Sequence, residues 1–523
     1  MKISRLIRFI TYCYYIVFAL GIIAVLAFSL RTTIVFRQYT ENDLFDYVRE
    51  NLPLLLGCLA VILAVTWWLL HHKYLNRNTA GKIEAAALIF AAATGTFLIL
   101  SIRGLATNDA LMLDRVINEF MEGDYSAMQP GGYLSVYPFQ IGYVMAGQLL
   151  YRLAGPSNYA VYQWINLASI LLTMYFLYKI TGIVFGDEET AALSAVLSFG
   201  ALFYYTYATY VYNDIWSVCL QTGAVFFCIC YLHGKDGKWR IISAAAAVIM
   251  IAAGYLLKSN CLIALIAMAA TLLFRAVKEL EEGQRRIALE RLAVIILMCC
   301  VSFGSSRLVN RHYAALAGME SMPKGVPTMS YLAMGMQEGE EGKAGWYNGF
   351  NARSLSENNY DWDTANEISK EAVRERWADF MSSRRRMVKF YYDKFISQWG
   401  DGTCVSLREQ ELTARHVENQ PEIAEWIVYG TGYRAAGWIM NVWHSLIYLG
   451  TAVYCVFAFR KRKPSDEEAM LVMFIFGGMM FHELWEASGR YIIRYYLTML
   501  PLAAYGFNRL LNRKPQDENN LTR

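Results

Sequence analysis

A polar interruption between hydrophobic stretches carries the residues best suited to chemistry. Asn108 and Asp109 follow an apolar segment that ends near residue 103, and Tyr137 and Gln140 open the next apolar segment. A carboxylate held at a membrane surface can act as a general base that deprotonates a hydroxyl group. The same position also suits a solvated aspartate or a helix cap, with Asn108 and Asp109 heading a short helix.

Two further polar interruptions lie between apolar stretches. Asn213 and Asp214 break an aromatic-rich run, and Lys258 separates two other apolar segments. Polar groups at such depth are costly unless they face a cavity or a partner. Asn213 and Asp214 therefore either line a site or form a short turn. Lys258 either neutralises a phosphate or extends its ammonium group to the interface.

The most concentrated group of ionisable residues lies near the C-terminus. His482, Glu486 and Arg490 follow one another at intervals of four, with Tyr491 and Arg494 close behind. On a continuous helix the first three would share one face. The forked donors of Arg490 and Arg494 suit a phosphate or pyrophosphate. The alternative is a Glu–Arg pair that joins the last two helices.

The composition identifies a polytopic membrane protein. The 523 residues are 56% hydrophobic and 18% charged, whereas soluble domains carry about 25% charged residues. The apolar residues cluster into runs long enough to cross about 30 Å of hydrocarbon. About 12 spans are predicted, near residues 9–30, 52–70, 83–103, 158–178, 189–211, 213–232, 239–257, 259–275, 289–308, 436–459, 467–485 and 491–511.

Lysine and arginine residues in the short loops predict the orientation. Both termini are expected in the cytoplasm of a multi-pass protein of the cell membrane, with the Asp109 loop outside. Cytoplasmic and outer loops alternate in this way only if residues 138–153 lie at the membrane surface as a juxtamembrane helix. The basic residues that define the cytoplasmic side are Lys2, Arg5, Arg8, Lys73, Arg77, Lys82, Lys235, Lys238, Arg240, Arg275, Lys278, Arg285, Arg286, Arg460, Lys461, Arg462 and Lys463.

Four parts are expected along the chain. Residues 1–82 form an N-terminal two-helix extension, and residues 83–309 form a transmembrane core whose first outer loop is 104–157. Residues 310–433 form a large extracytoplasmic loop region, and residues 434–523 hold the C-terminal transmembrane helices. Within the loop region, Arg384–Lys394 alternates cations with apolar residues. It suits either a helix lying on the membrane or an ordinary surface helix.

Several classes of site are missing from the sequence. It has no GxxxxGK[ST] loop and no GxGxxG motif for nucleotides, and its ten cysteines show no zinc-site spacing. A transferred group would therefore arrive activated on a lipid. No cofactor is expected, and the first loop lacks an acid pair at DxD spacing, which disfavours a metal but leaves a divalent cation open. No nucleic-acid partner is expected.

The order of these motifs resembles the GT-C superfamily of membrane glycosyltransferases, in particular the bacterial branch related to glycosyltransferase family 39 and the protein mannosyltransferases. The resemblance covers roughly residues 82 to 523. The segments that carry it are Thr107–Ala110, Tyr137–Gln140, Phe185–Asp187, Tyr212–Asp214 and Glu486–Tyr491.

The resemblance implies an all-α, GT-C-like bundle and a hexosyltransferase that moves a sugar from a polyprenyl-phosphate donor, with inversion. Asp109 matches the first-loop acid proposed as catalytic base, and Lys258, Arg490 and Arg494 fall where ligands of the donor phosphate are expected. The acceptor would be an extracytoplasmic cell-wall glycan, a glycolipid or a protein. The Asn108–Asp109 pair replaces the Asp-Glu pair of protein mannosyltransferases, which weakens the case for a protein acceptor.

Two other functions remain open at this point. A polyprenyl-linked glycan polymerase or ligase of the O-antigen type would place its key arginines in a large late loop, as Arg384–Arg386 would allow. A flippase or transporter of lipid-linked sugars should show inverted repeats and broken helices at the midplane. Neither feature is evident in the sequence.

Overall fold

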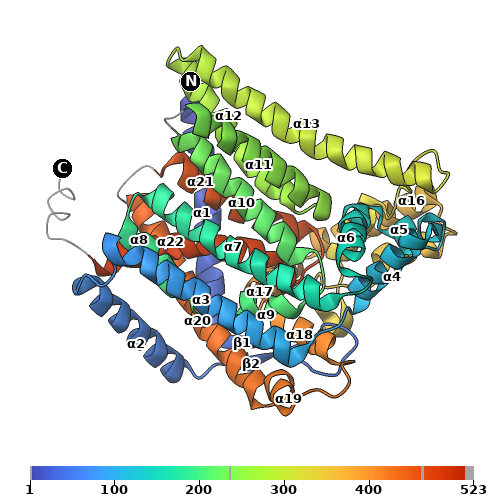
Figure 1. The fold of residues 1–523 in the computed structure, drawn as a ribbon, viewed down its shortest axis with the longest axis horizontal. Helices are drawn as coiled ribbons and strands as arrows, with labels where there is room; N and C mark the ends of the chain where they lie inside the picture. The colour runs from blue at the N-terminus through green and yellow to red at the C-terminus, as the bar shows by residue number, and fades with distance from the viewer. Residues whose placement is uncertain (1–2, 235–236, 461–463, 513–523) are drawn as a thin grey trace.

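The computed structural model describes residues 3–234, 237–460 and 464–512. Long helices form a bundle, and shorter helices gather at one end of it, around α4–α6 and α14–α16 (Figure 1). Nine helices of the described chain are long and apolar enough to cross a membrane. They are α1 (Ile3–Ser29), α2 (Leu52–His71), α3 (Arg77–Ile102), α7 (Tyr159–Phe185), α10 (Asp214–His233), α11 (Gly237–Leu257), α12 (Cys261–Glu281), α13 (Arg285–Leu316) and α20 (Thr431–Arg460).

The prediction of about 12 spans was too high: the described chain has nine, or ten if one bent pair is counted as a single span. The segment 189–211 is that pair, in which α8 (Glu188–Ser198) meets α9 (Leu202–Thr206) and η3 (Tyr207–Thr209) at 56°. The last two segments are helices, α21 (Asp466–Leu484) and α22 (Ile493–Leu511). Three acids open α21, and α22 is buried within the bundle along Ile493–Asn508, so neither has the composition of a lipid-facing span.

Several charged residues of the long helices are paired with one another. Lys179 of α7 lies 2.5 Å from Glu84 of α3, and Arg291 of α13 lies 3.0 Å from Glu279 of α12. Such pairing offsets the cost of charge away from water. Close helix packing relies on glycine between α20 and α22, because a Cβ atom on Gly506 would lie 2.1 Å from the Gly450 carbonyl oxygen.

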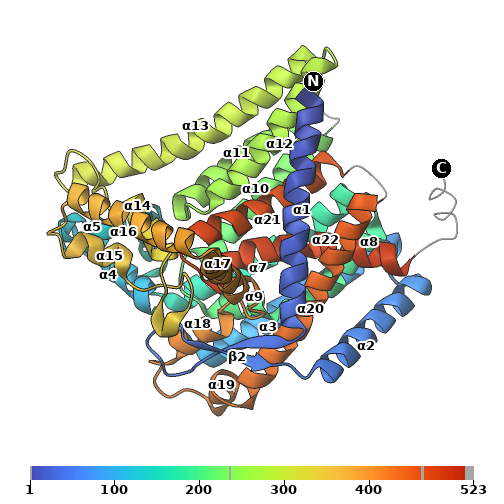
Figure 2. The same cartoon turned by 180° about the vertical axis from the view of Figure 1, so that it is seen from behind.

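The N-terminal part contains a β-hairpin that the two-helix prediction lacked. Strands β1 (Thr32–Phe36) and β2 (Phe45–Arg49) pair antiparallel, with Thr32 opposite Arg49 and Phe36 opposite Phe45. The hairpin follows α1, which runs beside α20, and lies near α19 (Figure 2). The loop at its tip, residues 37–44, contributes to the candidate functional site.

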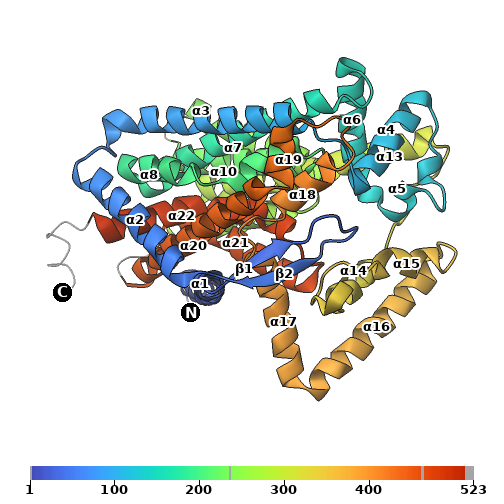
Figure 3. The same ribbon diagram turned by 90° about the horizontal axis from the view of Figure 1, so that it is seen from below.

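Further helices, most of them short, cover the end of the bundle at which this hairpin lies. They are α4 (Asn108–Glu122), η1 (Ser126–Met128), α5 (Tyr133–Val136), η2 (Pro138–Gln140), α6 (Ile141–Ala154), α14 (Thr328–Gly335), η4 (Glu340–Gly342), α15 (Phe350–Ser356), α16 (Trp362–Ser382), α17 (Arg384–Trp399), α18 (Ser406–Ala414), α19 (Glu422–Val428) and η5 (Gly489–Ile492). Helices α16 and α17 form a V that projects from the bundle (Figure 3). The 14 residues of α6 reach only about 21 Å, too short to cross about 30 Å.

The basic turns used to predict the orientation lie at the other end of the bundle. The start of α3 and the turn between α12 and α13 both lie away from α4–α6 (Figure 1). Lys2, Lys235 and residues 461–463 lie outside the described residues.

Candidate functional site

A cavity of about 480 Å³ opens at the end of the bundle that carries the short helices. Its walls come from parts of the chain far apart in sequence: the hairpin loop, the start of α4, the turn between α11 and α12, and the segment between α21 and α22. Asp109, Lys258 and Arg490 all line it, as do Asn108, Tyr137, Gln140, Asn213, His482, Glu486 and Tyr491.

Two cations, Lys258 and Arg490, form what we call the floor of the cavity, and the buried carboxylate of Asp214 lies next to both. The ammonium group of Lys258 donates to Asp214 and lies 3.4 Å from the Asn213 Oδ1 atom. Burial lowers the pKa of Lys258 to about 8, although the carboxylate of Asp214 acts in the opposite direction. Lys258 also lies 5.2 Å from the centre of the Tyr212 ring. Asp214 therefore holds Lys258 in place below the open space.

Arg490 forms the second cation of the floor. Its Nη1 atom lies 2.9 Å from Glu409 Oε1 and also donates to the Tyr210 hydroxyl, while its Nε atom lies 3.9 Å from Asp214 Oδ2. The guanidinium carbon lies 5.5 Å from the centre of the Tyr212 ring. The carboxylates of Glu409 and Asp214 and these aromatic rings fix its position.

Asp109 is exposed in the first turn of α4. The chain reaches this helix through Asn108, whose φ of +49° lies in the left-handed region, which Asn tolerates better than most residues. An acid in the first helical turn also interacts favourably with the helix dipole. Burial keeps the pKa of Tyr133 well above its usual value, and the neighbouring Asp109 acts in the same direction.

Glu486 provides a second acid on the Asp109 side of the cavity. Burial raises its pKa to about 7; Arg490 lowers it, whereas Asp109 and Asp43 raise it further. This carboxyl group therefore keeps its proton to a higher pH than an ordinary glutamate does. An acid with such a pKa can exchange protons under physiological conditions.

The turn that carries Glu486 is held by a buried lysine. Lys394 of α17 is fully buried and donates to the carbonyl oxygens of Gly335, Glu483 and Trp485, at 2.6, 2.9 and 2.6 Å. A Cβ atom on Gly335 would lie 2.5 Å from the Leu484 carbonyl oxygen, so the end of α14 can approach the end of α21 only with glycine there.

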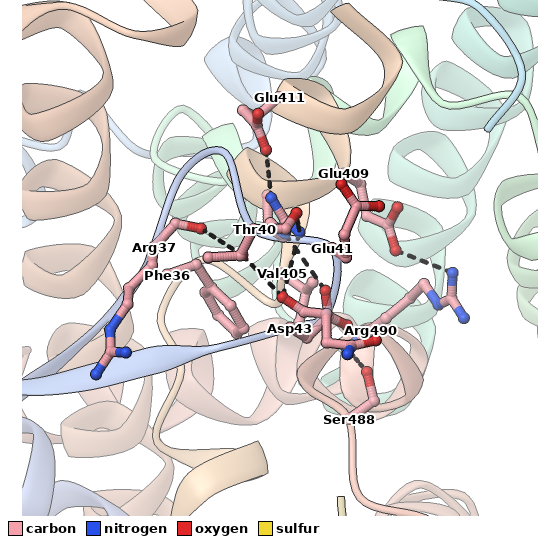
Figure 4. A network of polar contacts seen from close by, with 12 residues as sticks. Phe36, Arg37, Thr40, Glu41, Asp43, Val405, Glu409, Glu411, Ser488 and Arg490 are labelled. Carbon is pink, nitrogen blue, oxygen red and sulfur yellow. Dashed lines mark hydrogen bonds and ion pairs between the residues drawn. The ribbon is translucent and has the colours of Figure 1, made fainter. Parts of the chain in front are cut away.

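The hairpin loop closes another side of the cavity. Arg408 of α18, only 1% exposed, donates to the Thr40 carbonyl oxygen at 2.7 Å and lies 3.4 Å from Asp43 Oδ1. Figure 4 shows this loop, with Thr40, Glu41 and Asp43, arching toward Glu411 and Arg490. Residues 41–44 line the cavity, so the N-terminal part helps to build the site.

The remaining predicted residues fall into two groups. Gln140 donates to the Tyr212 hydroxyl at 2.6 Å and accepts from Asn213 at 3.1 Å, which links three parts of the wall. Arg494 lies apart from this wall: it is 3% exposed and donates to Gln221 at 2.8 Å and to Ser217 at 3.1 Å. The guanidinium group of Arg494 is thus engaged inside the bundle, and Arg494 is not among the residues that line the cavity.

Sequence reasoning missed several residues of the cavity. Most of them are aromatic or lie in segments without a recognisable motif, and only the tyrosines next to Asn213 gave a signal. The missed residues are Glu41, Asn42, Asp43, Tyr133, Tyr210, Tyr212, Tyr331, Trp346, Tyr347, Asn351, Glu409 and Trp485. Among the described residues, no group of three or more His, Cys, Asp or Glu side chains is placed to hold a metal ion.

The fold and the cavity define an integral membrane protein with a polar, aromatic-lined site at one end of its helix bundle. The chain belongs to the family described as "conserved hypothetical integral membrane protein", whose model matches residues 4–510. No curated protein matches the chain. Among solved structures, the oligosaccharyltransferase of Archaeoglobus fulgidus, in complex with zinc and sulfate, is similar at 17% identity with a TM-score of 0.41. The match covers 80% of this chain and 48% of that one, so this chain spans about half of that protein's length.

Proposed function

We propose that the protein is a glycosyltransferase that moves a sugar from a polyprenyl-phosphate donor to an acceptor hydroxyl outside the cell. One observation carries the proposal: Asp109, Lys258 and Arg490, from three distant parts of the chain, line a single cavity. The two cations suit the phosphate of a lipid-linked donor, and the exposed carboxylate suits a general base.

The reaction is a single displacement at the sugar C1 atom. The acceptor oxygen forms a bond to C1 while the bond from C1 to the phosphate oxygen breaks. Asp109 takes the acceptor proton, and the polyprenyl phosphate leaves with the bonding electron pair. Lys258 and Arg490 stabilise the charge that develops on this phosphate, which is worth several kcal/mol in a partly dry site. Attack opposite the leaving group inverts the configuration at C1.

The position of the cavity supports a lipid-borne donor. Its lining residues lie at one end of several candidate membrane spans, where the head group of a membrane lipid is found. The basic turns at the opposite end support a cytoplasmic placement of that end. The cavity would then open to the outside of the cell.

The test is sugar transfer from a radiolabelled polyprenyl-phosphate hexose by the purified protein in nanodiscs. Asp109→Asn should lower turnover by about 10²- to 10⁴-fold, the range that a general base contributes. Glu122→Gln, at the exposed far end of the same helix, is the matched control and should behave as the unmodified protein. Unchanged turnover in Asp109→Asn, with normal folding, would refute the assignment of Asp109.

A further inference from the structure

We infer that the acceptor is a carbohydrate, one pyranose ring of which binds against Tyr137, Tyr331, Tyr347 and Asn351. This inference rests on the proposed glycosyltransferase function and names its acceptor class. The last three residues come from the large region between α13 and α20, so that region would supply acceptor recognition.

We call the part of the lining around Lys258 and Arg490 the cationic side and the part around Asp109, Glu486 and three tyrosines the acidic, aromatic side; the two parts adjoin, because Arg490 also interacts with Glu486. Lys258 and Arg490 share Asp214 as a counter-ion on one side. On the other, electrostatic interactions with both Asp109 and Glu486 reach Tyr137, Tyr331 and Tyr347. Tyr212 lies between the two sides, since it interacts with Asp109 and faces both cations. A donor phosphate on the cationic side leaves the acidic, aromatic side for the acceptor.

The acidic, aromatic side contains buried polar atoms without a fully formed hydrogen bond. Asn351 is 3% exposed and interacts with the Tyr331 hydroxyl, but among the described residues neither the Asn351 Oδ1 atom nor the buried Tyr331 hydroxyl has a hydrogen bond of full geometry. Both residues line the cavity. An unsatisfied buried polar group costs about 1–3 kcal/mol. The hydroxyl groups of a sugar can donate to Asn351 Oδ1 and bond to the Tyr331 hydroxyl.

Exposed aromatic rings at the same place suit the apolar face of a sugar. Two residues of the lining are exposed: Tyr347 by 47%, and Phe139, whose ring centre lies 6.1 Å from that of Tyr137, by 51%. The C–H bonds of a pyranose carry a partial positive charge and pack against the negative face of an aromatic ring. A site with aromatic faces and orphaned hydrogen-bond acceptors matches both surfaces of a pyranose.

A peptide acceptor fits this wall less well. One recurring way to bind an extended peptide is through main-chain hydrogen bonds to an exposed strand edge. The wall from Tyr331 to Asn351 consists of α14, η4, α15 and the turns between them, and its described residues form no strand longer than an isolated bridge.

The experiment measures donor and acceptor kinetics separately. A polyprenyl-phosphate hexose is the donor, and a methyl hexopyranoside, a short oligosaccharide or a serine-containing peptide is the acceptor. Transfer to water, without acceptor, reports on the donor side alone. The variants are Tyr347→Ala and Asn351→Ala, with Tyr392→Ala on α17 as a control of similar exposure, 52%.

The expected result is transfer to the sugar acceptors, with acceptor KM raised about ten-fold in Tyr347→Ala and Asn351→Ala, and unchanged donor hydrolysis. Transfer to the peptide alone, or an acceptor KM that neither variant changes, would overturn the inference and leave the proposed function standing. A changed donor KM for hydrolysis in either variant would indicate that these residues contact the sugar of the donor instead of the acceptor. Donor turnover absent with every acceptor and with water would refute the proposed function itself.

Discussion

Asp214 and Lys258 form an ion pair directly below the cavity, and their side chains are only 2% and 12% exposed. Removing one partner of such a pair leaves an uncompensated charge in a place with little water. Because burial already lowers the pKa of Lys258 to about 8, the charge of this lysine depends on its carboxylate neighbour.

Asp214→Asn should therefore weaken donor binding, although it removes a negative charge near a phosphate site. Without the carboxylate, the pKa of Lys258 falls further below 8, and the lysine is largely neutral at pH 7.5. We expect donor KM to rise about ten-fold, equivalent to about 1.4 kcal/mol. The double variant Asp214→Asn, Lys258→Arg should recover part of this loss, because arginine remains charged. Tighter donor binding by Asp214→Asn would contradict this view.

Lys258 also predicts a pH dependence on the alkaline side. Its pKa is lowered, so the lysine loses its proton as pH rises through about 8. Donor KM should rise above this pH in the unmodified protein and stay level in Lys258→Arg. Initial rates from pH 6 to 9.5 with a fixed lipid composition measure both profiles. Identical profiles would remove Lys258 from the donor site.

Glu486 predicts a second titration at lower pH. Its pKa is raised from 4.5 to about 7 by burial, so it gains negative charge as pH rises through 7. Donor KM should therefore increase between about pH 6 and 8. Glu486→Gln should abolish this increase and keep the separate increase at alkaline pH that Lys258 causes. The same titration affects stability. The folded protein binds the Glu486 proton more tightly than the unfolded chain does, so the contribution of this proton to stability is lost as pH rises from 4.5 to about 7.

Arg490 should tolerate little change, because it bonds to Glu409 and Tyr210 together. Arg490→Lys keeps the charge but loses the planar fork, and we expect kcat/KM to fall roughly 10- to 100-fold. Arg490→Met should also lower the melting temperature, since Glu409 would then be buried without its cation. The double variant with Glu409→Gln should restore the melting temperature but not activity. Recovery of activity in the double variant would indicate a structural role alone.

Lys394 is predicted to act as a positioning residue for Glu486. Lys394→Met leaves three buried carbonyl oxygens without a donor, at about 1–3 kcal/mol each before relaxation. We expect a lower melting temperature and a shift of the Glu486 limb of the pH profile. Lys389→Met, on the same helix with a 75% exposed side chain, should change neither. A normal pH profile in Lys394→Met would limit its role to stability.

Much of the membrane architecture follows directly from the sequence. Apolar runs identify most of the long helices, because a membrane helix must bury its own backbone hydrogen bonds and be apolar over its length. The predicted number of spans was too high because one segment is a bent pair of helices and because α21 and α22 are less apolar than the candidate spans. The composition of α21 and α22 suits protein neighbours rather than lipid. Arg494 of α22, for example, donates a hydrogen bond to Gln221.

The sequence by itself determined the candidates Asp109, Lys258 and Arg490, because charged residues beside apolar spans need a special environment. Only the tertiary structure decided which of them share a cavity: Lys258 and Arg490 meet at Asp214, whereas Arg494, four residues further on, turns into the bundle. It also brought the hairpin loop, Glu409 and Tyr347 to the same wall. Lys258 lies 44 residues from Asp214, and the other contacts join segments that are hundreds of residues apart. Local patterns of residue type do not predict contacts between such distant segments.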